Sequence, residues 1–421
     1  MVPTIDLPNV EQRKRQWPLF HYQRNVYLLL LYTLGKGFQL SIGALAINLY
    51  IYSLGYHVDF IGIVTGVPAI GALISSIPVG ILADRIGRKP LLLISAALTP
   101  LTLVGVAIGT DGPFLITASI LNGILASAYW ITNLPMLTES TSEQERVGVL
   151  AMNSFLLLGV GALGSLIGGI VPELVGGLLH VAANSVVPLR WGVLISAIIA
   201  ALPGIGLFWL REPSRHGQQH MQETANGRAG IDPNRWQLVA LFTMLLLPDV
   251  LFVLGQSMVI SLLQLYFALR FRLNPGNLGV IFTVMGVIGG AMALLAPRLV
   301  QRWDKLRIAA VLQCISVPLV IGIGLAPTPI LAATAEFGRN IVRGLFEPVY
   351  ASFTMGSVSS RWRATLSGFY GITWSLGFGV GATLAGFLQQ HIGLSAPFFV
   401  GAGCIVIAPI LLFVFFGRVR T

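Results

Sequence analysis

Long apolar segments alternate with short polar ones along most of this chain of 421 residues. Each apolar segment has about 20–30 residues, which is enough for a helix that crosses a lipid bilayer. The pattern predicts twelve such helices, near residues 26–54, 58–82, 90–109, 113–137, 147–178, 189–210, 237–268, 275–299, 308–325, 329–357, 364–390 and 395–416. We therefore expect an all-α polytopic protein that lies in a lipid bilayer.

A polar stretch over residues 211–236 divides the twelve segments into six and six. It is rich in Gly, Gln, Pro and Arg, which is typical of a linker. His216 and His220 in this linker lie four residues apart, but two histidines alone do not make a metal site. We expect neither a metal nor a cofactor. The predicted parts are an N-terminal segment, a six-helix half, the linker, a second half and a tail, over residues 1–25, 26–210, 211–236, 237–416 and 417–421.

Composition and charge agree with the membrane class. The chain is 55% apolar and 10% charged, whereas soluble domains carry about 25% charged residues. Its net charge of +10 lies mostly in the termini and in alternate loops. By the positive-inside rule this distribution predicts that both termini are cytoplasmic, in the inner (cytoplasmic) membrane of a prokaryote, and it argues against nucleic acid as a partner.

Two further features concern processing and cysteine chemistry. Residues 26–54 are too long for the core of a signal peptide, so we expect the first segment to be retained. Cys314 and Cys404 both lie in apolar segments, which predicts neither a disulfide nor a metal ligand.

Charged side chains also occur inside apolar segments, where they are costly and point to function. Those in the tenth segment are Glu336, Arg339, Arg343 and Glu347. Their spacings of three, four and four residues place them on one face of a helix, which cannot face lipid. Lys36 in the first segment and Asp249 in the seventh are expected at about the depth of Arg339, near the middle of the bilayer.

We expect the cations of this group to bind an anionic part of a substrate, with Lys36, Arg339 and Arg343 as the candidates. We expect its carboxylates to exchange protons as their surroundings change, with Asp249, Glu336 and Glu347 as the candidates. The alternative is that these charges only neutralise one another. In that case Glu336 pairs with Arg339 and Arg343 with Glu347 along the helix, and Lys36 ties one half of the molecule to Asp249 in the other.

Amides and aromatic side chains in the first, fourth and seventh segments complete the expected substrate site, which suits an amphipathic ligand. They are Gln39, Asn122, Tyr129, Trp130, Asn133 and Gln256.

The loop between the second and third segments reads Gly80-Ile81-Leu82-Ala83-Asp84-Arg85-Ile86-Gly87-Arg88-Lys89. This stretch resembles the signature loop of the major facilitator superfamily. The resemblance implies twelve helices in two pseudo-symmetric halves that work by alternating access. It also implies a conformational latch, in which Asp84 lies against the start of the eleventh helix. The latch residues are then Gly80, where the helix ends approach closely, and Asp84, Arg85, Gly87, Arg88, Lys89 and Arg363.

An internal repeat is consistent with the two halves. A shift of 217 residues places Gly62 on Gly279, Gly164 on Gly381 and Gly169 on Gly386. Separately, Gly164 and Gly168 lie four residues apart, as do Gly377 and Gly381, and this spacing of small residues indicates close contacts between helices.

Two positions depart from the antiporter-like branches of the superfamily, which the chain otherwise resembles. Ser165 stands where those branches carry a proline in the fifth helix, and Ser119 stands where they carry an arginine in the fourth. Residues 159–164 match the letters of the dinucleotide-binding fingerprint G-x-G-x-x-G. They are not preceded by a predicted strand, so we do not expect the strand–turn–helix that binds a dinucleotide.

The function most favoured by the sequence is proton-coupled export or antiport of small amphipathic organic solutes by a secondary transporter, with a proton or another ion as the coupling partner. A carrier of organic anions or lysolipid-like solutes is the alternative, and a transport-inactive sensor or scaffold on the same fold is the second alternative. No arrangement of residues indicates an enzyme. A monomer is the default state that the fold implies.

Overall fold

The computed structural model describes residues 22–211, 235–293, 305–358 and 362–416. In these ranges the chain is helical and has no strand. The helices of the first half are α1 (Arg24–Ser53), α2 (Val58–Ile86), α3 (Arg88–Ile108), α4 (Gly112–Glu139), α5 (Glu143–Ser154), η1 (Phe155–Val160), α6 (Leu163–Leu179), α7 (Val186–Gly206) and η2 (Leu207–Trp209). Those of the second half are α9 (Arg235–Ile260), α10 (Leu263–Phe271), α11 (Pro275–Ala293), α13 (Lys305–Leu325), α14 (Pro329–Gly356), α15 (Arg363–His391) and α16 (Ala396–Phe416).

Among the described residues, eleven helical stretches are long and apolar enough to cross a membrane. The helix α14 is not one of them, although it has 28 residues, because it carries the four charges noted above. The predicted segments therefore agree with the observed helices, and the end of the eighth segment, at 294–299, lies outside the described residues.

Two of the predicted spans are interrupted. The fifth contains the π-helix η1 between α5 and α6, and the seventh breaks at Ser261 and Leu262, between α9 and α10. At this second break Asn48 of α1 donates a hydrogen bond to the carbonyl oxygen of Ser261 at 3.2 Å. A broken helix leaves backbone carbonyls free to accept such bonds inside the membrane.

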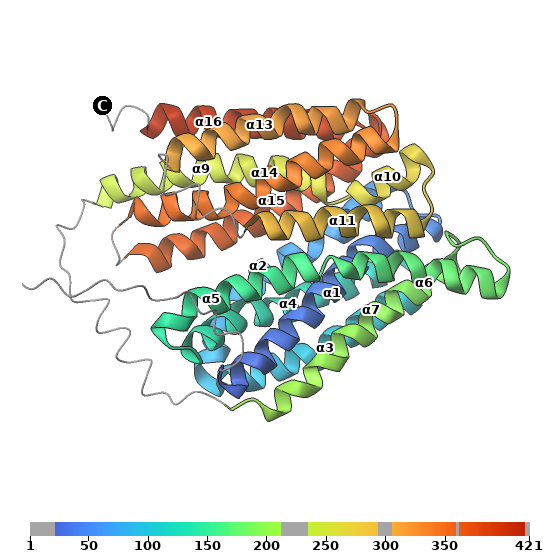
Figure 1. Ribbon diagram of the computed structural model, residues 1–421, viewed down its shortest axis with the longest axis horizontal. Helices are drawn as coiled ribbons and strands as arrows, with labels where there is room; N and C mark the ends of the chain where they lie inside the picture. Colours follow the sequence, from blue (N-terminus) through green and yellow to red (C-terminus); the bar gives the residue numbers. More distant parts are fainter. Residues whose placement is uncertain (1–21, 212–234, 294–304, 359–361, 417–421) are drawn as a thin grey trace, which may run out of the picture.

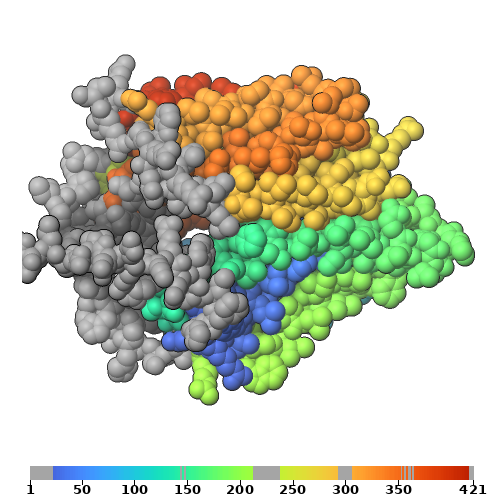
Figure 2. Space-filling model, in the orientation of Figure 1, coloured from blue at the N-terminus to red at the C-terminus, as the bar shows by residue number. Residues whose placement is uncertain are grey.

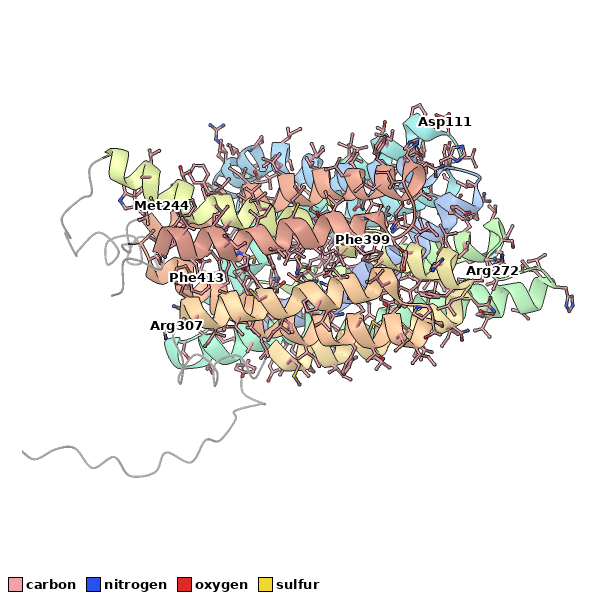
Figure 3. The ribbon with its side chains drawn as sticks, turned by 90° about the horizontal axis from the view of Figure 1, so that it is seen from above. Asp111, Met244, Arg272, Arg307, Phe399 and Phe413 are labelled. Carbon is pink, nitrogen blue, oxygen red and sulfur yellow. The ribbon has the colours of Figure 1, made fainter. Side chains whose placement is uncertain are left out.

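The helices form two bundles that lie side by side along the long axis (Figure 1). The helices α1 to α7 occupy the lower part of that view, and α9 to α16 the upper part. The bundles meet mainly where α2 packs on α15 and α6 packs on α11. We call the end where α2 meets α3 the linker end, and the end where α1 meets α2 the far end. Figure 3 shows Asp111 and Arg272 at the far end and Met244, Arg307 and Phe413 at the linker end.

Glycines bring the two bundles into close contact at the far end. A methyl group at Gly62 would lie 2.8 Å from the Cα atom of Gly386, and one at Gly169 would lie 3.0 Å from the Cα atom of Gly279. These four glycines are the repeat-related pairs of the sequence. The two contacts are therefore equivalent by the internal repeat, as two halves related by a pseudo-twofold axis require. Figure 2 shows the second contact from outside, where the yellow surface of α11 lies directly on the green surface of α6.

The faces of α2 and α15 that meet at Gly62 and Gly386 separate toward the linker end. Gly80 follows Gly62 by 18 residues and Gly368 precedes Gly386 by 18, about five helical turns in each case, so each lies on the same side of its helix. A methyl group added at Gly80 or at Gly368 would have no described atom within 4 Å. Ile77, one turn from Gly80, is 72% exposed. Among the described residues, α2 and α15 are thus in close contact at the far end and apart at the linker end, whereas α11 stays in contact with η1, where a methyl group at Gly290 would lie 2.5 Å from the Cα atom of Gly159.

Candidate functional site

Among the described residues, the most buried charged side chains lie on α14. Arg339 is 1% exposed, and its guanidinium donates to both carboxylate oxygens of Glu336, at 2.6 Å and 2.5 Å. Its third bond goes to Oε1 of Gln256 on α9, at 2.7 Å. Asn340 also donates to Glu336, at 2.8 Å. Arg339 and Glu336 are therefore a satisfied buried pair, of the kind whose desolvation cost is offset by good geometry.

A second pair lies two turns further along α14, toward the linker end. Arg343 donates to Glu347 at 2.7 Å, and their side chains are 29% and 46% exposed. A small pocket next to Arg343 is lined by Gln256 of α9 and by Gln313 and Ser316 of α13. Oε1 of Gln313 has no hydrogen-bond partner among the described residues. The face predicted from the spacing of these charges thus exists, and both intrahelical pairs are formed.

Lys36 differs from these arginines. Its side chain is 6% exposed, and none of the described carboxylates forms an ion pair with it. Its ammonium nitrogen lies 5.9 Å from the centroid of the Tyr129 ring. A cation over an aromatic face gains some electrostatic stabilisation, but far less than a buried ammonium loses with its water.

Polar groups of α4 and α5 surround this part of α1. Thr33, one turn before Lys36, donates to Asn153 of α5 at 2.7 Å. Asn133 of α4 donates to Thr33 and to Asn153, both at 3.2 Å, and its own side-chain oxygen has no partner among the described residues. Tyr129 donates to Thr33 at 3.4 Å. We call Thr33, Lys36, Tyr129, Asn133 and Asn153 the first-half cluster.

Asp249 of α9 is also buried and lacks a cation. It is 6% exposed, and none of the described Lys, Arg or His side chains pairs with it. Its Oδ2 atom lies 2.6 Å from the hydroxyl of Thr373 on α15. The same hydroxyl lies 3.0 Å from the carbonyl oxygen of Tyr370. The tie between Lys36 and Asp249 considered above is not formed, because each is held within its own half.

Three other predicted site residues form no hydrogen bond with these groups among the described residues. Gln39 is buried, and its side-chain oxygen has no hydrogen-bond partner among the described residues. Asn122 donates to Thr102 of α3 at 2.8 Å, which turns its amide toward a neighbour within the first half. Trp130 is 54% exposed and packs edge-on against Tyr129.

The predicted latch loop is only partly described. Gly80 was expected to approach another backbone closely; a methyl group there has no described atom within 4 Å, and residues 359–361, before the start of α15, lie outside the described residues, so this expectation stays a prediction. Gly87 has a φ angle of 96°, in the region that favours glycine, and so permits the sharp turn between α2 and α3. Arg88 pairs with Glu139 of α4, and Lys89 donates to the carbonyl oxygen of Phe208 at 3.1 Å.

Asp84 and Arg85 are exposed at the end of α2. The start of α15 carries their expected partner surface, but residues 359–361 and the side chain of Arg363 lie outside what the structure describes. The latch contact of Asp84 therefore stays a prediction.

Thr33, Asn153 and Thr373 were not predicted from the sequence. Thr33 lies one turn from Lys36 on the same helix, and this spacing was a usable signal. Asn153 and Thr373 lie on other helices, and only the packing brings them to Asn133 and Asp249. Among the described residues, no group of three or more His, Cys, Asp and Glu side chains is placed to hold a metal.

Comparison with known proteins identifies a family and solved structures that are similar to this chain. A family model described as Major Facilitator Superfamily matches residues 29–382. The solved nucleoside transporter NupG is similar at 15% identity with a TM-score of 0.73, and the match covers 93% of this chain and 99% of that chain. The xylose transporter XylE from E. coli, in an inward-open conformation, is similar at 16% identity with a TM-score of 0.71, over 93% and 96% of the two chains.

A bacterial homolog of the human lysosomal transporter Spinster, in an inward-facing and occupied conformation, is similar at 17% identity and a TM-score of 0.71, over 94% and 96% of the two chains. Identities this low show a shared fold alone. A search of curated protein sequences finds no match.

Proposed function

Because the chain belongs to the major facilitator superfamily and is an integral multi-pass membrane protein, we propose that it carries a small organic anion across the membrane by alternating access. The solved structures of the same fold include transporters of nucleosides and of xylose, so the fold does not choose the substrate. The choice has to come from the charges inside this chain.

The observation that carries the proposal is the unequal pairing of the three cations predicted to bind substrate, of which Lys36 and Arg339 are buried and Arg343 is partly exposed. Arg339 has Glu336 and Arg343 has Glu347, whereas Lys36 has no carboxylate among the described residues. An ammonium group removed from water is stable only when an anion or several acceptors replace the water. A carboxylate or phosphate group of the substrate would supply that anion, next to the hydroxyl and amide groups of Thr33, Tyr129 and Asn133.

We assign proton coupling to Asp249. The hydroxyl of Thr373 has one hydrogen but lies within bonding distance of two oxygens, on Asp249 and on the Tyr370 backbone. A protonated Asp249 that donates to Thr373 leaves the hydroxyl free to donate to the carbonyl of Tyr370, and both bonds are then formed. A buried carboxyl group without a cation fits this protonated form. Release of that proton to one side of the membrane would drive the transport of the anion.

The test is ligand-induced thermal stabilisation of the purified protein, over a panel of anionic, zwitterionic and cationic solutes. A ligand that binds only the folded state raises its melting temperature. We expect anionic solutes to stabilise the parent protein and Arg270→Gln, which removes an exposed cation at the far end. We expect Lys36→Gln to lose this effect. Stabilisation by anions that is unchanged in Lys36→Gln would refute the assignment.

A second candidate is the proton-coupled export of amphipathic compounds. The half-exposed ring of Trp130 beside Tyr129 favours it, because aromatic faces bind lipophilic cations. Expression of an exporter of this kind raises resistance of the host to lipophilic cations, and expression of an anion carrier does not. We expect no such resistance. We also propose that both termini are cytoplasmic and that the protein is a monomer.

A further inference from the structure

Two side chains at the far end reach across the boundary between the bundles and bind the start of a helix in the other one. The first is Gln390, near the end of α15. Its side-chain oxygen accepts a hydrogen bond at 3.1 Å from the backbone N–H of Val58, the first residue of α2. The residue before this helix, His57, makes no side-chain bond to cap it. Gln390 therefore supplies a helix cap from the opposite half.

The second is Glu173 of α6. Its carboxylate accepts a hydrogen bond at 3.3 Å from the backbone N–H of Gly276, the second residue of α11. The first residue of α11 is Pro275, which has no N–H to donate, so Gly276 carries the first free donor of this helix.

The internal repeat relates these two contacts. Glu173 and Gln390 are 217 residues apart, and so are Val58 and Pro275, where the two capped helices begin. In both contacts the capping residue comes four residues after a glycine of the close crossing, Gly169 or Gly386. The far end is thus closed by two equivalent units, and each combines a glycine–glycine crossing with a cap one turn further out.

We propose that Glu173 and Gln390 are positioning residues for the transport cycle, which hold the far end closed by capping α11 and α2 from the opposite half. They touch helix ends and not substrate. Opening the far end separates α2 from α15 and α6 from α11, so both caps must break in every cycle. Because Gln fills at one contact the position that Glu fills at the other, the acceptor oxygen is the required feature, and the negative charge is not.

One other contact lies beside the first cap. Nε2 of His391 is 3.8 Å from Oδ2 of Asp59, and both side chains are about half exposed. An exposed pair at this distance contributes little. The buried hydrogen bond from Asn48 of α1 to Ser261 also joins the two halves, beside the caps and the glycine crossings.

The experiment measures the distance between spin labels at Asn184 and Ile392, which are exposed at the far end, one in each half. Labels are placed in the full chain after Cys314→Ser and Cys404→Ser, in lipid nanodiscs. Loss of a cap changes the equilibrium constant between the state with the capped helix end and the state without it about fivefold. We expect Glu173→Ala and Gln390→Ala each to raise the ratio of open to closed far ends about fivefold. The double variant should raise it about 25-fold, because the free-energy changes of two separate contacts add.

Conservative variants separate a cap from an electrostatic role. Glu173→Gln and Gln390→Glu keep an acceptor oxygen, and we expect both to keep the distance distribution of the parent. Asp111→Ala removes an exposed carboxylate of the same end and serves as the control. The proposal is overturned if neither alanine variant changes the distribution, or if Glu173→Gln opens the far end as much as Glu173→Ala. Because the two contacts lie on different helices, Gln390→Ala tests the proposal even if Glu173→Ala does not fold.

Discussion

Arg339 and Lys36 are both buried cations, but they differ in what surrounds them. Arg339 donates three hydrogen bonds to Glu336 and Gln256, whereas Lys36 has a tyrosine ring and no carboxylate among the described residues. The arginine is thus part of the folded structure of α14, and the lysine is the cation that we propose for an anionic ligand. We therefore expect substitution of Arg339 to lower the stability of the protein and substitution of Lys36 to abolish the binding of anions.

Arg339→Gln should lower the stability of the protein by about 3–5 kcal/mol, because it leaves Glu336 buried without a cation. The double variant Glu336→Gln/Arg339→Gln should recover most of that loss, since it removes both charges. Thermal unfolding in the same detergent measures both. Arg343→Gln is the matched control, and removing its more exposed pair with Glu347 should cost about 1 kcal/mol or less. A double variant that is no more stable than Arg339→Gln would contradict this account.

Asp249→Asn should separate proton coupling from transport. Asn is nearly the same size and still bonds to Thr373, but it cannot release a proton. In proteoliposomes we expect accumulation driven by a pH gradient to be lost, while exchange of substrate across the membrane continues. Accumulation that remains in Asp249→Asn would assign the proton to another carboxylate, such as Glu336 or Glu347.

At the scale of helices, glycines set how closely the bundles approach. A methyl group at Gly62 would lie 2.7 Å from the carbonyl oxygen of Ala382 and 2.8 Å from the Cα atom of Gly386. Both are backbone atoms, which cannot rotate away. On α2, Gly80 lies on the same side of the helix with open space around it.

Gly62→Ala should therefore push α2 away from α15 and favour opening of the far end, whereas Gly80→Ala should leave the state seen here unchanged. An alanine in a helix interior is otherwise favoured over glycine by about 1 kcal/mol, so Gly80→Ala should be neutral or slightly stabilising. Reaction rates of single cysteines at the far end with a water-soluble thiol reagent measure the opening. Equal rates in the two variants would show that the crossing does not control closure.

At the scale of the whole molecule, the structure shows one of the two states that alternating access requires. In the part of the chain that the structure describes, α2 and α15 are in close contact at the far end, and Asp84 is exposed at the linker end. The expected partner of Asp84 is the start of α15, so this contact belongs to the state that is closed at the linker end.

Asp84→Asn should weaken that other state, because a carboxylate at a helix N-terminus is stabilised by the helix dipole and an amide much less so. We expect labels at Ile77 and Ile372 to spend more time far apart, and the rate of transport to fall. Asp111→Asn, at the far end, should change neither. An unchanged label distance in Asp84→Asn would remove Asp84 from the latch.

The sequence alone determined the features that depend on a residue's own segment. Lipid excludes the charged side chains that water favours, so hydropathy located the eleven apolar spans of the described residues. Fixed helical geometry placed Glu336 beside Arg339 and Arg343 beside Glu347. Equal spacing in the two halves also revealed the internal repeat that relates Gly62 to Gly279 and Gly169 to Gly386, but not that these glycines meet across the bundles. These inferences needed no knowledge of how the helices pack.

The tertiary structure decided which side chains meet across helices and which end is closed. The position and rotation of each helix placed Gln256 on Arg339 and Thr373 on Asp249, left Lys36 without a carboxylate among the described residues, and kept Lys36 apart from Asp249. Such contacts join residues from distant parts of the chain, and no local pattern encodes them. The closed end depends on a balance between two arrangements of the same helices, and small contacts such as the caps of Glu173 and Gln390 shift that balance.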